Sequence, residues 1–496
     1  MTESNLPVAI IGAGPVGLAA AAHLLERGET PIVFESGAEV GASVRAWGHV
    51  RMFSPWEYTV DSATSRLLQV SGWQMPPKDE LPTGNDLVDR YMLPFANLPE
   101  VSQHIQLNAR VVAVSRRNID KMKDTGRDEA PFVLHVAYAN GDEKLVEARA
   151  VIDASGTWSQ PNPLGSGGLP AVGEKHLQER IAYGIPDVKN TEKLRYGNQR
   201  VLVVGSGHSA INVLLELAEL KRTYPQTTIT WAMRGTNLQR VFGGGENDGL
   251  PARASLGARM QKLVDNGMVE IVSPFRIREL VASTDGVSVI GETYDGDLVL
   301  TVDQIIATTG ARPDLNMLRE LRLDLDSSLE STRTLAPMID PNIHSCGSVP
   351  PHGEAELRHP EKNFYMVGMK SYGRAPTFLL ATGYEQVRSV VAGLVGDWEA
   401  ARDVQLVLPE TGVCSTDLAG EGGAACCSPA VSQSATLSLF DIPIKREPVA
   451  NMPLQIRGGH LIALEPILLQ TSAESCGCDD TCCADGVKST TCGIDE

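Results

Sequence analysis

The stretch LPVAIIGAGPVGLAAAAHLLERG (residues 6–28) joins a short apolar run to an Ala/Leu-rich run through the glycine spacing G-x-G-x-x-G. The apolar run predicts a buried strand, and the Ala/Leu run predicts a helix. So tight a turn needs Gly12 for the bend, Gly14 for close approach of the backbone to a diphosphate, and Gly17 for helix–strand packing. The loop of Gly12, Gly14, Pro15 and Gly17, followed by a helix N-terminus, therefore predicts a dinucleotide site.

The following strand, TPIVFES (30–36), ends on the acidic residue Glu35. An acid at this place accepts hydrogen bonds from the ribose hydroxyls of a bound dinucleotide. Strand, glycines, helix and acid in register are far more specific than the glycine motif alone. Glu35 is therefore predicted to bind ribose, and an acid-tipped site suits FAD.

The pattern recurs in VLVVGSGHSAINVLLELAEL (201–220), where Gly205, Gly207 and Ala210 take the glycine positions and His208 and Ser209 lie between them. The next strand, TITWAMRG (228–235), ends on Arg234 instead of a carboxylate. An arginine there suits a ribose 2′-phosphate and favours NADPH over NADH. The alternative for Arg234 is a solvated loop residue, and Arg240 is a second candidate for the same phosphate.

Two nucleotide loops in a chain of 496 residues predict an α/β protein of more than one domain. We expect a Rossmann-like FAD domain of residues 1–165 and 311–400, with a Rossmann-like NADPH domain of residues 166–310 inserted in it. VIDASGTWSQP (151–161), whose turn holds Gly156, and IIATTGARPD (305–314) are predicted to pair as hinge segments. The segment 363–394 should return the chain to the first domain and aim a helix N-terminus near Thr377 at the flavin.

Charge and composition bear on the partners and the compartment. The formal net charge of -18 argues against nucleic acid or an anionic membrane surface as the main partner. No run approaches the roughly 18 apolar residues that span a bilayer, and the N-terminus MTESNLPVAIIGAG lacks a basic region. We therefore expect a cytoplasmic protein that binds no membrane; nothing in the sequence indicates its oligomeric state.

Residues 1 to about 400 resemble the two-dinucleotide-domain flavoproteins, most of all the NADPH-dependent flavin monooxygenases of bacterial arsenic-resistance operons. The likeness lies in GASVRAWGHVRMFSPWEYTVDS (41–62), VGSGHSA (204–210) and GMKSYGRAPTFLLATGYEQVRSV (368–390). The resemblance implies that Arg45 and Trp47 lie along FAD, and that Gly368 and Met369 lie near its ribityl chain, where related flavoproteins often have an Asp. It further implies that O₂ is the oxidant and that a trivalent arsenical or antimonite is oxidised to the pentavalent form.

Two other functions remain open from the residues. A flavin-dependent disulfide or metal-ion reductase shares the two-domain plan but needs a cysteine pair beside the flavin. Neither 36–70 nor 166–310 contains a cysteine, so such an enzyme would have to use thiols from elsewhere in the chain. The third possibility is a non-catalytic flavoprotein that sequesters a metalloid, which would leave the pyridine-nucleotide site without a purpose.

The cysteines gather in an acidic tail, residues 401–496. Only Cys346 precedes residue 400, and the other eight lie between Cys414 and Cys492. Cysteines in a reducing compartment point to metal binding or redox work, and the absence of CxxC…CxxC spacing disfavours structural zinc. Thiolates select soft ions. We expect the tail to capture the metalloid through Cys426, Cys427, Cys476, Cys478, Cys482, Cys483 and Cys492, with an electron relay as the alternative.

Overall fold

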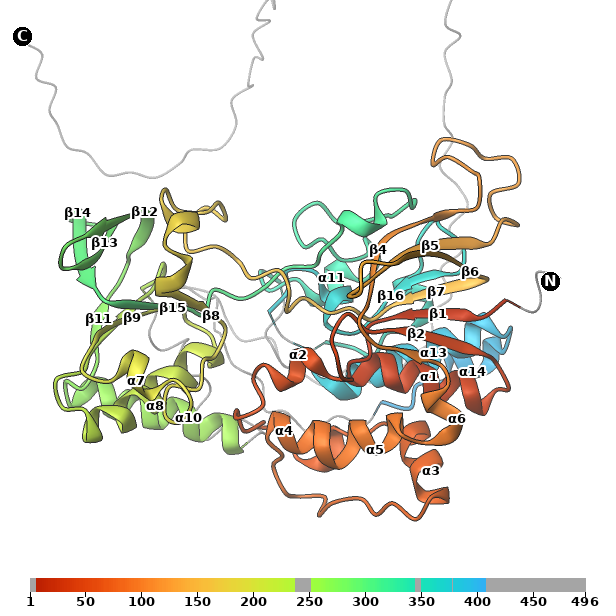
Figure 1. The fold of residues 1–496 in the computed structure, drawn as a ribbon, viewed down its shortest axis with the longest axis horizontal. Helices are drawn as coiled ribbons and strands as arrows, with labels where there is room; N and C mark the ends of the chain where they lie inside the picture. The colour runs from red at the N-terminus through yellow and green to blue at the C-terminus, as the bar shows by residue number, and fades with distance from the viewer. Residues whose placement is uncertain (1–5, 237–250, 344–348, 377, 407–496) are drawn as a thin grey trace, which may run out of the picture. The chain divides into compact units, whose positions relative to one another are not determined.

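The computed structural model describes residues 6–236, 251–343, 349–376 and 378–406 (Figure 1). The chain forms two compact units, Met1–Gly422 and Gly423–Glu496. The described residues all belong to the first unit. The second unit, and with it most of the predicted cysteine-rich tail, lies outside the described residues.

The first sheet has five parallel strands in the order β16-β7-β1-β2-β3. These strands are Phe364–Met366, Ala150–Asp153, Val8–Ile11, Pro31–Phe34 and Ile105–Gln106. The sequence 6–28 forms β1, the glycine turn and helix α1 (Pro15–Glu26), as predicted. Because the strands are parallel, all their carboxyl ends lie at one edge, which is where α1 begins.

Alternate residues of β1 pack on opposite faces of this sheet. Val8 and Ile10 pack with α1 and with α13 (Leu380–Leu394). Ala9 and Ile11 pack with the antiparallel strands β4, β5 and β6 (Ala109–Arg116, Phe132–Tyr138 and Glu143–Ala148). Because β1 is buried on both faces, its sequence is a continuous apolar run and not an alternation of apolar and polar residues.

Short helices fill the connection from β2 to β3 and the stretches around α13 (Figure 1). Those between β2 and β3 are α2 (Ala42–Arg45), η2 (Trp56–Tyr58), α3 (Ser62–Val70), α4 (Gly84–Leu87), η3 (Val88–Met92), α5 (Leu93–Ala96) and α6 (Pro99–Ser102). Those around α13 are α11 (Ala336–Ile339), α12 (Glu354–Leu357), η8 (Gly368–Tyr372) and α14 (Trp398–Arg402). Helix α14 spans the predicted start of the tail at residue 401.

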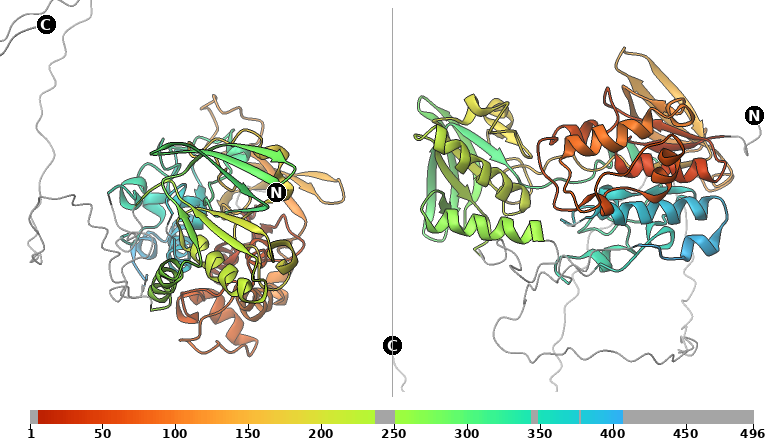
Figure 2. Two further views of the ribbon diagram at one scale, coloured as in Figure 1. Left: turned by 90° about the vertical axis from the view of Figure 1, so that its left-hand side faces the viewer. Right: turned by 90° about the horizontal axis from the view of Figure 1, so that it is seen from below.

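The second sheet repeats the plan of the first. Its five parallel strands run in the order β11-β10-β9-β15-β8, which are Glu270–Val272, Thr228–Ala232, Arg200–Val204, Gln304–Ala307 and Ile181–Tyr183. Helices α8 (His208–Thr223), α10 (Pro251–Asp265) and α7 (Lys193–Tyr196) lie on one side (Figures 1 and 2). The antiparallel strands β12, β13 and β14 (Arg276–Ser283, Gly286–Thr293 and Gly296–Val302) cover the other. The second glycine loop thus lies at the carboxyl end of β9, as predicted.

Two passages of the chain connect the first sheet with the second: residues 154–180 lead from β7 to β8, and residues 308–363 lead from β15 to β16. The first passage includes η4 (Glu174–His176) and η5 (Gln178–Arg180), and the second includes η7 (Asn316–Leu318). The two passages pair at the bridge Pro161↔Ala311. Around it, Asn162 N donates to Gly310 O at 2.9 Å, and Arg312 N donates to Gln160 O at 2.9 Å. The predicted pairing of the hinge segments is therefore confirmed.

The predicted domain boundaries, 165/166 and 310/311, fall inside these two passages, and the division into an FAD and an NADPH domain stays a prediction. Helix α13 begins at Leu380, and Thr377, near which its start was expected, lies outside the described residues. No helix in the described part of the chain is long and apolar enough to cross a bilayer.

Candidate functional site

The first glycine loop leaves room for a diphosphate at the N-terminus of α1. Gly12 has φ +99, and a Cβ there would lie 2.8 Å from the carbonyl oxygen of Ala154. A Cβ on Gly17 would lie 1.9 Å from Gly12 O, so helix and strand can pack this closely only without a side chain. Gly14, the N-cap, has no side-chain cap, and a Cβ there would meet no atom within 4 Å. Open space beside a helix N-terminus that no side chain caps fits the diphosphate of a dinucleotide.

Glu35 is tied to this loop by its carboxylate. Oε2 accepts a hydrogen bond from Ala13 N at 2.8 Å, and Oε1 accepts one from Gly37 N at 2.8 Å. The residue is 8% exposed. A carboxylate has about four acceptor positions, so two backbone donors leave capacity for ribose hydroxyls. The place of Glu35 therefore fits its predicted role.

Arg45, predicted to lie along the flavin nucleotide, is bound by protein groups. Its guanidinium donates to Glu39 Oε1 at 3.1 Å, to Asn85 Oδ1 at 2.9 Å and to Asp89 Oδ1 at 2.6 Å. The hydrogen bonds to Asp89 and Glu39 raise the pKa of Arg45 further above its usual value. Trp47 packs against the buried apolar side chains that surround β1, α1 and α13. Contact of either residue with a cofactor stays a prediction.

The second glycine loop has the same construction. Gly205 has φ +133, and a Cβ there would lie 2.4 Å from Thr308 O. Gly207 is the N-cap of α8 without a side-chain cap, and a Cβ on it would meet open space. Ala210, in the third glycine position, is fully buried. This helix N-terminus therefore also fits a diphosphate.

His208 and Ser209 form the first turn of α8. The His208 ring centroid lies 5.6 Å from that of Phe53, so the segment 41–62 reaches the second glycine loop. Arg234 follows β10 and is exposed, and its Nη1 donates to Ser166 O at 3.0 Å. That bond ties the predicted phosphate ligand to the first passage and leaves its other N–H groups for a ligand. Arg240 lies outside the described residues.

The turn after β16 approaches the first loop. A Cβ on Gly368 would lie 3.3 Å from Cγ2 of Val16, in the first turn of α1. Gly368 N donates to Gln386 Oε1 at 2.8 Å, so α13 fixes this turn. Met369 beside it is half-buried. In the other predicted turn, Gly156 has open space where a side chain would be. The structure thus places Gly156 and Gly368 on segments that flank the first nucleotide loop.

Sequence reasoning missed three charged or polar residues that meet behind this loop. Lys370 Nζ donates to Asp153 Oδ2 at 2.6 Å and to Ser155 Oγ at 3.1 Å. The sequence did contain a signal for this contact: the apolar stretches VID and FYMVGMK each end on a charged residue. A charge that is buried at the end of a strand requires a partner, so the two residues could have been proposed as a pair.

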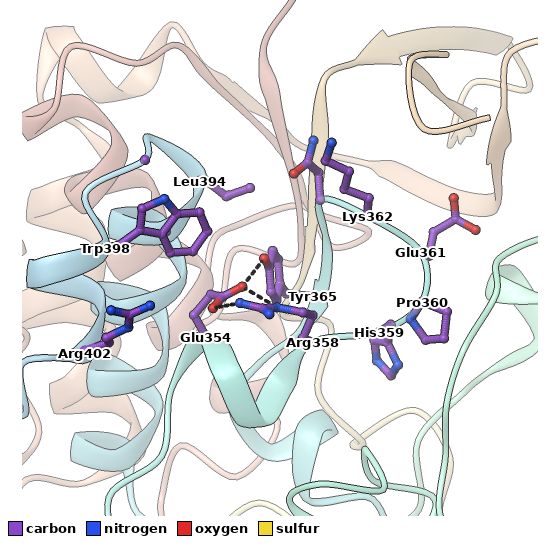
Figure 3. Close-up of a pocket in the computed structure, with 13 residues that line it drawn as sticks. Glu354, Arg358, His359, Pro360, Glu361, Lys362, Tyr365, Leu394, Trp398 and Arg402 are labelled. Carbon is purple, nitrogen blue, oxygen red and sulfur yellow. Dashed lines mark hydrogen bonds and ion pairs between the residues drawn. The ribbon is translucent and has the colours of Figure 1, made fainter. Parts of the chain in front are cut away.

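A cavity of about 640 Å³ lies at the opposite edge of the first sheet (Figure 3). Its lining includes residues 359–363, which precede β16, and Trp398 and Arg402 of α14. Glu354 in its wall accepts hydrogen bonds from Arg358 and from the Tyr365 hydroxyl. Both glycine loops lie at carboxyl ends of strands, so this cavity is separate from both predicted dinucleotide loops.

All nine cysteines, including the seven predicted to bind a metalloid, lie outside the described residues. Among the residues that are described, no three or more His, Cys, Asp or Glu side chains form a group that could hold a metal ion. The thiol site in the tail therefore stays a prediction.

The family model described as pyridine nucleotide-disulphide oxidoreductase matches residues 9–347. The chain belongs to this family. Rat flavin-containing monooxygenase 1 is 27% identical over 265 residues, which are 52% of this chain and 45% of the rat protein. The chain therefore spans about half the length of the curated relatives it matches.

Among solved structures, bacillithiol disulfide reductase from Bacillus cereus covers 79% of this chain and 99% of its own, with a TM-score of 0.59 and 18% identity. The FAD-bound cadaverine monooxygenase DfoA from Erwinia amylovora covers 82% and 98%, with a TM-score of 0.55 and 14% identity. At these identities the likeness shows the fold alone. As a member of the pyridine nucleotide-disulphide oxidoreductase family, the chain is an FAD-dependent oxidoreductase with FAD and NADPH as cofactors, as predicted.

Proposed function

We propose that this oxidoreductase is an NADPH- and FAD-dependent monooxygenase that oxidises trivalent arsenicals (arsenite or methylarsenite) or antimonite, with the cysteine-rich tail capturing the metalloid. The observation that carries the proposal is the distribution of cysteine. Residues 1–345 contain no cysteine, and they include both glycine loops, β7 and its turn, and the whole second sheet. No dithiol from this part of the chain can therefore receive electrons from the flavin, which favours O₂ as the oxidant.

The proposed reaction balances without a further reagent. One oxygen atom of O₂ forms a bond to the trivalent arsenic or antimony, which loses two electrons. The other oxygen atom leaves as water, with two electrons from NADPH and two protons from NADPH and solvent. The substrate reacts through a lone pair and has no proton to lose, so the proposal requires no general base.

The residues of the two loops would hold the cofactors. The N-terminus of α1 at Gly14 would bind the FAD diphosphate, with Glu35 on the ribose. The N-terminus of α8 at Gly207 would bind the NADPH diphosphate, with Arg234 on the 2′-phosphate. Bound FAD supplies the redox chemistry, whereas these residues bind and orient the nucleotides.

A second candidate is a flavin-dependent disulfide or metal-ion reductase that uses the tail thiols. Two observations favour it: the likeness in fold to bacillithiol disulfide reductase, and the concentration of eight cysteines between residues 414 and 492. In this candidate the tail thiols would take the place of the missing dithiol.

The dependence on O₂ separates the two candidates. NADPH oxidation by the full-length protein would be followed with arsenite, methylarsenite and antimonite, in air and without O₂, together with O₂ uptake and pentavalent product. We expect stimulation by one of these substrates, with one O₂ consumed per NADPH and no turnover without O₂. Steady turnover without O₂, using a disulfide or metal ion as acceptor, would overturn the oxygenase proposal.

A further inference from the structure

A closed ring of hydrogen bonds joins Asp153, Ser155 and Lys370 behind the first glycine loop. Lys370 Nζ donates to Asp153 Oδ2 at 2.6 Å and to Ser155 Oγ at 3.1 Å. The Ser155 hydroxyl donates to Asp153 Oδ1 at 2.6 Å, and Ser155 N donates to the same oxygen at 3.1 Å. Both charged side chains are 0% exposed.

Stability alone does not account for this ring. Removing a carboxylate and an ammonium from water costs several kcal/mol for each ion, and a well-packed apolar pair is often as stable. What a buried pair does provide is geometry, because each partner accepts only a narrow range of positions for the other. The question is therefore which parts of the fold the ring holds in place.

The ring connects two segments that flank the first nucleotide loop. Ser155 belongs to the turn after β7, and a Cβ on Gly12 would lie 3.0 Å from Ser155 Cα. Lys370 belongs to η8, whose first residue, Gly368, lies against Val16 of α1. Ser155 of the ring thus lies against the bend of the glycine loop, and Gly368, two residues before Lys370, lies against the start of the helix that follows it.

Helix α13 fixes the side of the ring that carries Lys370. Gln386 accepts from Gly368 N at 2.8 Å and donates to Ser371 Oγ at 2.9 Å, and the Ser371 hydroxyl donates to Gly368 O at 2.7 Å. Lys370 therefore projects from a turn that has little freedom. The turn 154–156 has, besides the ring, the backbone bond from Ala154 N to Ile11 O at 2.9 Å.

We propose that Lys370 is a positioning residue for FAD: through Asp153 and Ser155 it holds the turn 154–156 against the first glycine loop and so sets the shape of the flavin-nucleotide site. The inference rests on FAD as the cofactor and not on oxygenation. Its failure and that of the proposed function are therefore distinguishable, since FAD affinity and O₂ dependence are measured separately.

The test measures FAD affinity and thermal stability separately on full-length holoprotein. The affinity follows from FAD release on dilution, read as the gain in FAD fluorescence, and the thermal midpoint is measured in excess FAD. Ser155→Ala removes one hydroxyl from the ring, and Asp153→Leu/Lys370→Met replaces the ion pair by an apolar pair. We expect the Kd for FAD to rise about threefold or more in the first and about tenfold or more in the second, with the thermal midpoint of each close to that of the unchanged protein.

The matched control is Glu361→Gln. Glu361 forms an equally buried ion pair with Arg116 at 2.7 Å, but it precedes β16, at the edge of the sheet away from the glycine loop. This variant should lower the thermal midpoint and leave the Kd for FAD unchanged. The proposal is overturned if Ser155→Ala and the apolar pair bind FAD with the Kd of the unchanged protein. It is also overturned if the Kd for FAD rises only in variants whose thermal midpoint falls. Should the apolar pair fail to fold, the Kd of Ser155→Ala decides.

Discussion

At the scale of single residues, the residues that end two corresponding strands are predicted to decide which nucleotide each site takes. Glu35 follows β2 and is held by two backbone N–H groups. Arg234 follows β10 and is exposed, with one bond to Ser166 O. A carboxylate suits ribose hydroxyls and repels a 2′-phosphate, whereas a guanidinium binds that phosphate.

Arg234→Ala should therefore weaken NADPH binding and leave NADH binding almost unchanged. The lost charge-assisted hydrogen bonds amount to about 1.5–3 kcal/mol, or roughly a ten- to hundredfold rise in KM for NADPH. Steady-state kinetics with both nucleotides measure the change, and FAD content should stay constant. Arg222→Ala, which removes another exposed arginine, is the control. An unaltered preference for NADPH in Arg234→Ala would show that this strand end does not bind the phosphate.

Glu216 on α8 predicts a pH dependence of stability. Burial raises the pKa of this carboxyl to about 7, and its Oε2 has no hydrogen-bond partner. Because the pKa of Glu216 is raised in the folded protein, the neutral carboxyl favours folding. This contribution of Glu216 to stability is present below the usual pKa of 4.5 and is lost as the pH rises through 7. Glu216→Gln should thus stabilise the protein by about 1–3 kcal/mol at pH 8 and have little effect near pH 5.

Thermal midpoints of the two proteins at pH 5 and pH 8 test this expectation. Glu219→Gln is the control, because Glu219 on the same helix forms an ion pair with Lys189; it should bring no gain at pH 8. Equal midpoints for Glu216→Gln and the unchanged protein at pH 8 would contradict a buried charge at this position.

At the scale of elements, each glycine loop joins a buried strand to a helix that has no side-chain cap. Each loop contains one glycine whose missing side chain leaves open space, Gly14 or Gly207, and one that meets protein atoms, Gly12 or Gly205. A helix N-terminus leaves backbone N–H groups without an intrahelical acceptor, and diphosphate binding at these two positions stays a prediction. We therefore expect the glycines in open space to serve a ligand, whereas those in contact with protein atoms serve the fold.

Substitutions at Gly14 and Gly17 should separate these two roles. Gly14→Ala places a methyl group in the space for the diphosphate, and its φ of -76 is acceptable to alanine. It should raise the Kd for FAD about tenfold or more without destabilising the protein. Gly17→Ala places a Cβ 1.9 Å from Gly12 O and should destabilise the protein itself. Gly207→Ala should affect NADPH and not FAD.

FAD release on dilution, the KM for NADPH and the thermal midpoint distinguish these outcomes. If Gly14→Ala retained FAD as firmly as the unchanged protein, the diphosphate would not lie at the start of α1.

At the scale of the whole molecule, the same architecture is used twice and a long acidic segment follows it. Each parallel sheet has helices on one face and three antiparallel strands on the other. Both glycine loops, both passages and α13 lie before residue 406. Eight cysteines lie after it. The predicted nucleotide sites and the proposed metalloid-capturing thiols therefore lie in different parts of the chain.

Truncation after residue 406, which keeps α14, should leave FAD binding and reduction by NADPH intact. It should raise the apparent KM for the arsenical and change kcat little, because tethered thiols raise the local concentration of substrate, to about millimolar for short flexible linkers. Cys482→Ser/Cys483→Ser should reproduce part of this rise. Steady-state kinetics over a range of arsenite concentrations measure both. A collapse of kcat at saturating substrate would instead indicate that the tail thiols carry electrons, and would favour the reductase.

Residues close together in the chain account for most of what could be predicted. The glycine spacings place both nucleotide loops, the strand ends place Glu35 and Arg234, and small-residue turns mark the two paired passages. Each of these features is encoded within about 30 residues, as one strand–turn–helix unit. The contacts of Arg45 with Asn85 and Asp89, and of Gly368 with Gln386, could not be predicted in this way. Each depends on helices whose packing no local pattern specifies.

The order of the amino acids is therefore enough to indicate an α/β chain with two predicted dinucleotide loops, the nature of each strand-end residue and the absence of cysteine before residue 346. Local spacing and side-chain chemistry suffice for these features. The contact between Asp153 and Lys370, which are 217 positions apart, is visible only in the folded chain, where both side chains meet without exposure to solvent beside the first glycine loop. The two side chains meet because β7 and β16 lie side by side in the sheet. Each charge needs the other there, since burial of either one alone would cost too much free energy.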